Sequence, residues 1–197
     1  MAVVERILGD IFDTRYRNNK TCIVHQCNCL TIKAGGLAHS IFNNFGNYAN
    51  VYSWKREYKY NIAVAADRDI PGTIKFCHGS PNVIALFGQF FPGGLDYRNY
   101  LQKILANDND YHLRTGFEND EQRHRLLYFK QGLAHLYEFL QSSKFIRTIV
   151  FPSRIGCGIA DGHWPQYEKE IEKFAARLKN NNNNRAFNVI IVEKYLV

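Results

Sequence analysis

Two glycine-rich stretches carry most of the chemistry that this 197-residue sequence displays. The first, NCLTIKAGGLA (28–38), and the second, FPSRIGCGIADGHW (151–164), each follow an apolar run typical of a strand and precede a run typical of a helix. Glycines let backbone N–H groups approach an anion, and the start of a helix attracts negative charge. Two such loops beside strand ends can therefore hold a diphosphate between them. For either loop alone, a tight strand-to-helix turn explains the glycines equally well.

Neither loop matches a familiar phosphate-binding or metal-binding motif. The second loop lacks the Gly-Lys-Ser/Thr of a Walker A motif, and Asp161 stands where a Rossmann fingerprint has its third glycine. His25, Cys27 and Cys29 are spaced more tightly than the usual zinc ligands, and no second ligand pair completes a site. We therefore expect no metal and no cofactor.

The composition is that of a globular protein with a basic surface. Hydrophobic residues make up 46% of the chain and the formal net charge is +7, which favours anionic partners. The stretch YSWKREYKY (52–60) combines aromatic and basic residues. It predicts either a surface that stacks nucleic-acid bases or an amphipathic helix that buries Val51, Trp54 and Tyr58.

Cysteine usage and the chain's first residues suggest a compartment. Five dispersed cysteines, no signal-peptide pattern and no apolar run of membrane length predict an intracellular protein, cytoplasmic or nuclear, without membrane contact. We expect a monomer.

Apolar periodicity predicts that strands and helices alternate along the chain. Strands are expected at 3–8, 22–26, 72–77, 82–90, 145–151 and 187–197, and helices at 35–45, 120–140 and 164–179. This alternation predicts one α/β domain over residues 1–197, with helices on both faces of a sheet. Residues 91–119 have weak periodicity and many turn formers, which fits a lid or a plain surface loop. The asparagine run at 180–185 predicts an exposed turn.

Four sequence blocks, taken in order, resemble the macrodomain family of ADP-ribose-binding modules. The blocks are GDIF (9–12), HQCNCLTIKAGGLAHSIF (25–42), FPSRIGCGIADGHW (151–164) and VIIVEKYLV (189–197). The NC and RIGCG forms are most similar to the branch that contains the terminal ADP-ribose glycohydrolase and the yeast-type ADP-ribose 1''-phosphate phosphatase. The resemblance implies a three-layer α/β/α sandwich with a mixed central sheet. It also implies ADP-ribose, or an ADP-ribosylated protein, as partner.

The same resemblance implies a set of ligand-binding residues. Asp10 would accept a hydrogen bond from the adenine amino group, Asn28 would bind the distal ribose, and Tyr195 would stack on adenine. A turn cap at Asp10, an Asx turn at Asn28 and a core or edge position for Tyr195 are the alternatives. The other implied binding residues are Ile11, Gly35, Gly36, Leu37, Ser153, Gly156, Cys157, Gly158 and Ile159.

Catalytic residues are less clearly indicated than binding residues. The resemblance points to His25, Asp161 and His163 as acid, base or nucleophile candidates. Asp161 lies one position later than the catalytic aspartate of the glycohydrolases, and Gly88 or Gln89 stands where that branch has a lysine.

These residues lead to three functional hypotheses. We expect ADP-ribose binding with hydrolysis of a derivative, either a phosphomonoester at the terminal ribose or protein-linked ADP-ribose. The alternative is a non-catalytic reader of ADP-ribosylated partners. A basic nucleic-acid-binding domain is the least favoured of the three.

Overall fold

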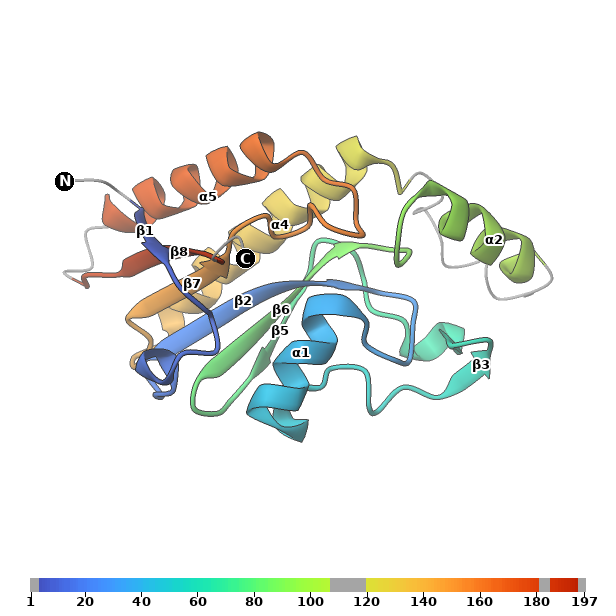
Figure 1. Cartoon of the computed structure of the whole chain (residues 1–197), viewed down its shortest axis with the longest axis horizontal. Coiled ribbons are helices and arrows are strands. Elements are labelled where there is room, and N and C mark those ends of the chain that lie inside the picture. The colour runs from blue at the N-terminus through green and yellow to red at the C-terminus, as the bar shows by residue number, and fades with distance from the viewer. Residues whose placement is uncertain (1–3, 107–119, 181–184, 195–197) are drawn as a thin grey trace.

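The computed structural model describes residues 4–106, 120–180 and 185–194, and its centre is a six-stranded mixed sheet (Figure 1). The strand order is β1-β8-β7-β2-β6-β5, and every neighbouring pair is parallel except β5 and β6. The strands are β1 Glu5–Leu8, β2 Thr21–Asn28, β5 Ile74–Cys77, β6 Asn82–Gln89, β7 Thr148–Pro152 and β8 Asn188–Glu193.

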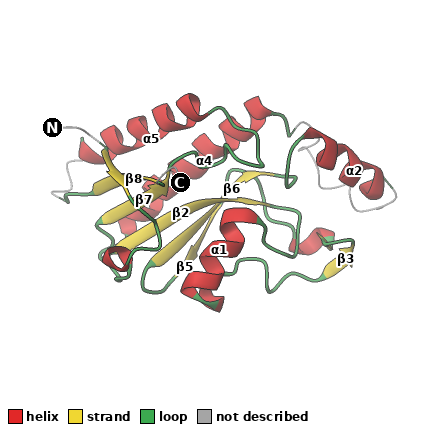
Figure 2. Ribbon diagram, in the orientation of Figure 1, coloured by secondary structure: helices red, strands yellow, loops and turns green. Residues whose placement is uncertain are grey.

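Helices cover both faces of this sheet (Figure 2). Helix α1 (Gly36–Phe45) packs on one face, and α4 (Gln122–Ser142) and α5 (Trp164–Lys179) pack on the other. Among the described residues, the remaining helices are α2 Leu95–Leu105 and the 3-10 helices η1 Thr14–Tyr16, η2 Asn47–Ala49 and η3 Ala65–Asp67. The predicted α/β/α sandwich with a mixed central sheet is confirmed.

Strand side chains alternate between two separate cores. On β2, Ile23 and Cys27 belong to the core beneath α1, while Cys22 and Val24 belong to the core beneath α4 and α5. Because both faces are covered, the central strands are almost continuously apolar rather than alternating with polar residues. This parity decides which side of the sheet each polar residue at a strand end can reach.

The helix over 164–179 begins and ends where the sequence predicts. Pro165 occupies the first turn, where its missing N–H costs no hydrogen bond. Tyr167, Ile171, Phe174 and Leu178 are buried at helical spacing against the sheet. In the part of the chain that the structure describes, no helix is both long enough and apolar enough to cross a membrane.

Two segments differ from their predictions. Residues 52–60 form no amphipathic helix: turns lead into the short strand β3 (Glu57–Lys59), which pairs with β4 (Ile62–Ala63). Val51 is buried as expected, but Trp54 and Tyr58 are exposed. The segment 91–119 contains α2, whose polar surface hid its periodicity because only Leu101 and Leu105 are buried. The end of that segment, 107–119, and most of the asparagine run lie outside the described residues.

One irregularity in the sheet lies at the end of β2 and β6. Cys27 pairs with Phe87, but the next residue, Asn28, pairs with Gln89, so Gly88 is the extra residue of a β-bulge. The bulge lies at the edge where the carboxyl ends of the five parallel strands meet. Loops that follow those strand ends therefore leave the sheet side by side.

Candidate functional site

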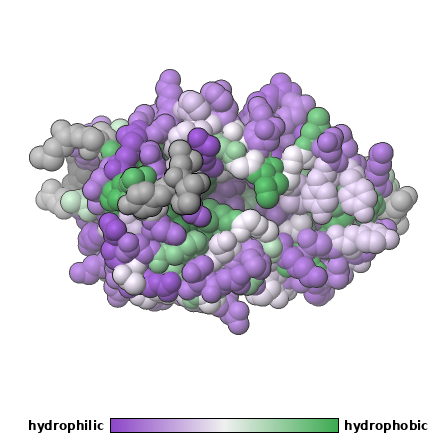
Figure 3. Space-filling model, viewed as in Figure 1, coloured by the Kyte–Doolittle hydropathy of each residue, from purple (hydrophilic) through white to green (hydrophobic). Residues whose placement is uncertain are grey.

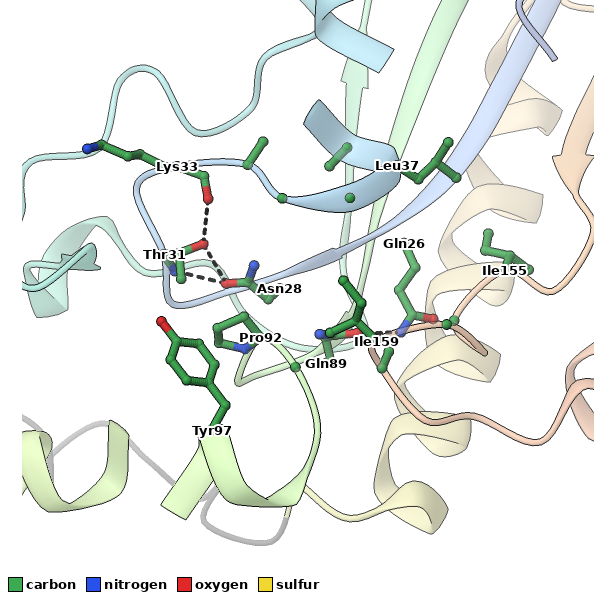
Figure 4. A pocket seen from close by; sticks show the side chains of 18 of the residues that line it. Gln26, Asn28, Thr31, Lys33, Leu37, Gln89, Pro92, Tyr97, Ile155 and Ile159 are labelled. Atoms are coloured by element: carbon green, nitrogen blue, oxygen red, sulfur yellow. Dashed lines mark hydrogen bonds between the residues drawn. The ribbon is translucent and has the colours of Figure 1, made fainter. Parts of the chain in front are cut away.

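A cavity of about 520 Å³ opens at the carboxyl edge of the sheet (Figure 4). The loops that follow β2, β6 and β7 form most of its wall, and Tyr52 and Asn61 complete it. Eight of the binding residues predicted from the sequence line this cavity: Asn28, Gly35, Gly36, Leu37, Ser153, Gly156, Gly158 and Ile159.

The two glycine turns face each other across the cavity. A β-carbon at Gly36 would lie 3.8 Å from Cδ1 of Ile159, so the first and second loops approach within side-chain contact. Gly36 and Gly156 have φ values of 53° and 72°, a left-handed conformation that side chains disfavour. This backbone conformation favours glycine at both positions, and at Gly156 a β-carbon would also overlap Gln26.

Asn28 ends β2 with its side-chain oxygen already occupied. Its Oδ1 accepts hydrogen bonds from the backbone N–H of Leu30 (3.0 Å) and from the N–H and hydroxyl of Thr31 (2.9 and 3.0 Å). The Asx turn proposed as an alternative is thus present. Because the oxygen is used, the side chain can offer only the N–H donors of Nδ2 to a ligand, and Nδ2 lies 3.4 Å from the Tyr52 hydroxyl.

A glutamine pair forms the floor between the two loops. Gln26 donates from Nε2 to Oε1 of Gln89 (2.8 Å), and Gln89 donates from Nε2 to the carbonyl of Phe91 (2.9 Å). Gln26 is enclosed by two glycines, because a β-carbon at either Gly88 or Gly156 would overlap its side-chain amide. Because neither glycine has a side chain, the amide of Gln26 has room to lie between Gly88 and Gly156.

A buried ion pair holds two walls of the cavity from behind. Arg125 of α4 donates from Nη1 to the carbonyl oxygens of Gly93 (2.9 Å) and Ala160 (2.8 Å). Its Nη2 lies 2.8 Å from Oδ2 of Asp120, and both side chains are buried. Asp120 in turn accepts two backbone N–H bonds from the loop after β6, at 3.1 and 2.9 Å. One guanidinium thus joins the loop after β6 to the loop after β7.

The predicted catalytic residue His25 does not line the cavity. β2 continues three residues beyond it, so His25 lies within the strand rather than at its end, and its side chain is only 1% exposed. Its ring nitrogen Nδ1 lies 3.5 Å from Sγ of Cys27. Burial lowers the pKa of His25 from 6.5 to about 4, which keeps the imidazole neutral at physiological pH.

Burial of His25 predicts that the protein loses stability between pH 6.5 and pH 4. In that range the unfolded chain binds a proton that the folded chain excludes. The contribution of His25 to the free energy of unfolding is therefore complete above pH 6.5 and falls by about 3 kcal/mol towards pH 4. Urea unfolding across pH 4–8 measures this slope, and His25→Leu should flatten it. An unchanged slope in His25→Leu would contradict the assignment. Asp67, whose pKa Arg56 lowers to about 2, titrates below this range.

Asp161 and His163 also lie outside the cavity wall. Asp161 faces an adjoining pocket of about 250 Å³, where its Oδ2 accepts a hydrogen bond from Nε2 of Gln122 (3.1 Å). Its neighbour Ala160 lines both the pocket and the cavity. His163 occupies the N-cap position of α5, where its side chain makes no capping hydrogen bond.

Three of the four remaining predicted binding residues have other surroundings. Asp10 accepts the backbone N–H of Phe12 at Oδ1 (2.9 Å) in a turn after β1, and Ile11 is buried in the core beneath α1. Cys157 donates from Sγ to the carbonyl of Ile155 (3.3 Å), and burial raises the pKa of its thiol to about 11. The structure therefore indicates a packing role for Ile11 and Cys157. Tyr195 lies outside the described residues.

Sequence reasoning missed part of the cavity wall. Gln26 and Gln89 could have been found, because each is a polar residue at the end of a long apolar strand. Tyr52, Asn61 and Tyr97 gave no such signal, since they come from irregular segments and from the polar helix α2. Lys33 and Arg154 are the cations of the described wall.

Comparison with known proteins identifies the fold. No family model matches the sequence, and no curated protein matches it. Among solved structures, it is similar to a mutant of the Oceanobacillus iheyensis macrodomain, with 15% identity over 96% of this chain and 82% of that chain and a TM-score of 0.55. The same macrodomain with MES bound aligns with 13% identity, the same coverage and a TM-score of 0.52. The chain therefore has the macrodomain fold.

Proposed function

We propose that the cavity binds ADP-ribose, either free or attached to a protein. The observation that carries this proposal is the approach of two glycine turns across one cavity whose described wall holds Lys33 and Arg154 but no aspartate or glutamate. Such turns offer backbone N–H donors without a β-carbon between them and a diphosphate. A volume of about 520 Å³ falls within the usual range for nucleotide-sized ligands.

The polar groups around the cavity suggest how the ligand lies. The diphosphate is expected between Gly36 and the turn at 156–159, with the distal ribose beside the Nδ2 donors of Asn28. Asp10 follows β1 at the same edge of the sheet, and its Oδ1 is engaged by Phe12. Its Oδ2 therefore supplies the acceptor for the adenine amino group.

Hydrolysis of an ADP-ribose derivative is a second proposal, and it depends on Asp161. This residue has a φ of 58° and adjoins Ala160, which lines the cavity, and its carboxylate is held by the exposed Gln122. A ligand that draws the loop inward would exchange the Gln122 contact for one with water or the distal ribose. Without that movement, no histidine, cysteine or carboxylate lies in the described wall, which favours binding without turnover.

Isothermal calorimetry with ADP-ribose tests the binding proposal. We expect micromolar affinity that depends weakly on salt, because the contacts are mainly backbone N–H donors in a cavity. Absence of heat with ADP-ribose would overturn it. A hypoxanthine analogue, which lacks the adenine amino group, should bind more weakly if Asp10 reads that group.

Two turnover assays separate a hydrolase from a reader. The first measures phosphate release from ADP-ribose 1''-phosphate, and the second measures loss of label from an ADP-ribosylated protein. Activity that Asp161→Asn removes while ADP-ribose affinity is retained would support the hydrolase. Binding of ADP-ribose without turnover in either assay would support a non-catalytic reader of ADP-ribosylated partners.

A further inference from the structure

Exposed tyrosines gather on two elements beside the cavity mouth. Tyr58 and Tyr60 belong to the β3–β4 hairpin and are 37% and 65% exposed, while Tyr97 and Tyr100 belong to α2 and are 42% and 51% exposed. Figure 3 shows pale residues, of intermediate hydropathy, at the end of the molecule that carries α2 and β3. Single exposed aromatics are ordinary, but four around one opening need an explanation.

Both elements are fastened to the cavity wall. Tyr97 lines the cavity, and its ring lies 6.1 Å from that of Tyr100, one helical turn further on, with an angle of only 18° between the ring planes. Asn61, which follows Tyr60, also lines the cavity and accepts the backbone N–H of Lys33 at 2.9 Å. The hairpin and α2 therefore flank the same opening.

Cations without carboxylate partners accompany these rings. Lys59 places Nζ 5.2 Å from the ring centroid of Tyr58 and 5.9 Å from that of Tyr60. Within the described residues, Lys59, Lys33 and Arg154 form no salt bridge. The other basic residues of 52–60 differ, because Lys55 pairs with Asp69 and Arg56 with Asp67. Of the three cations in this segment, two are therefore paired with aspartates, and Lys59 is the one that forms no salt bridge within the described residues.

We propose that this surface, the tyrosine rim (Tyr58, Lys59, Tyr60, Tyr97 and Tyr100), binds single-stranded nucleic acid. The nearly parallel rings of Tyr97 and Tyr100 offer faces on which unpaired bases stack, and Lys59 offers a positive charge to a neighbouring phosphate. A protein partner fits less well, because a protein interface needs an apolar centre. Leu95 is the exposed aliphatic residue on α2, and one leucine does not supply such a centre. The rim goes beyond the ADP-ribose proposal and does not depend on it.

Fluorescence anisotropy with a labelled oligothymidylate of about 12 nucleotides tests this surface. Tyr100→Ala and Tyr60→Asn should each weaken binding by at least about fivefold, and together by about 25-fold or more. Asparagine is used at position 60 because it tolerates the left-handed φ of 49°. Lys59→Ala should lower the slope of log affinity against log salt by about 0.7.

Phe145→Ala is the matched control, since this exposed aromatic precedes β7 at the opposite end of the strands. Absence of wild-type binding at about 50 mM salt, or an equal loss in Phe145→Ala, would overturn the proposal. Calorimetry with ADP-ribose on the Tyr60→Asn/Tyr100→Ala variant should match wild type, because neither residue lines the cavity. Failure of the nucleic-acid proposal and failure of the ADP-ribose proposal can therefore be told apart.

Discussion

Arg125→Ala is expected to lower the free energy of unfolding by about 3–5 kcal/mol and to abolish ADP-ribose binding. The substitution leaves Asp120 as a buried carboxylate without its cation, which is among the costliest single changes in a protein core. It also removes the donor that joins the carbonyls of Gly93 and Ala160, so two walls of the cavity lose their common support. Thermal or urea unfolding measures the first effect and calorimetry measures the second.

Two further variants separate stability from cavity geometry. Arg123→Ala, in an exposed pair with Glu121, should change stability by less than about 0.5 kcal/mol. The double variant Asp120→Leu/Arg125→Met removes both charges and should be more stable than Arg125→Ala, although the two N–H groups and two carbonyls that the pair served lose their partners. It should not recover ligand binding, because methionine cannot donate to the two carbonyls. Wild-type affinity in the double variant would show that the guanidinium does not set the spacing of the loops.

Gly36→Glu is expected to reduce ADP-ribose affinity by about 100-fold or more. The new side chain would enter the gap between the glycine turns, where the β-carbon already lies 3.8 Å from Ile159. A carboxylate about 4 Å from a phosphate charge is repelled by about 4 kcal/mol at an effective dielectric constant of about 20. Repulsion of this size exceeds the binding free energy that corresponds to a loss of affinity of about 100-fold.

Gly36→Ala is the control for the backbone at this position. Both variants place a side chain at a φ of 53°, so each should lose about 1–2 kcal/mol of stability. Only the glutamate adds charge and bulk to the cavity. Equal calorimetric affinity of the two variants would contradict the placement of the diphosphate. Gly35→Ala should be tolerated, because Gly35 has an extended φ of −127° and open space around its β-carbon.

The layers of the fold could be predicted because burial on two faces leaves a clear pattern. Helix α5 repeats Tyr167, Ile171, Phe174 and Leu178 at intervals of three or four residues, and its bounds follow from that spacing. The central strands are apolar runs bounded by turns. Helix α2 escaped prediction because Leu101 and Leu105 are its only buried side chains, so its sequence is mostly that of a solvated surface.

The loops that line the cavity were easier to predict than side chains that face into it, for a physical reason. Glycine turns act through their backbone, so Gly36 and Gly156 indicate the position of the cavity whichever way the neighbouring side chains point. A catalytic side chain must also face the ligand. His25 illustrates the difference: β2 continues to Asn28, two residues beyond its predicted end, and His25 shares the strand face of Ile23 and Cys27, so this imidazole points into the core beneath α1.

Gly88 also matters because it adds one residue to β6, and not only because it lacks a side chain. In an unbroken pleat Gln89 would share the face of Phe87, which lies in the core beneath α1. At the bulge its amide instead reaches Gln26, whose own side chain lies beside Tyr167 on the opposite face. With the same residues in a regular pleat, this amide would turn away from Gln26 and into the core beneath α1. Relatives of this chain are therefore best compared by the number of residues between Phe87 and Phe91, since that number decides whether the strand needs the bulge to keep this glutamine beside Gln26.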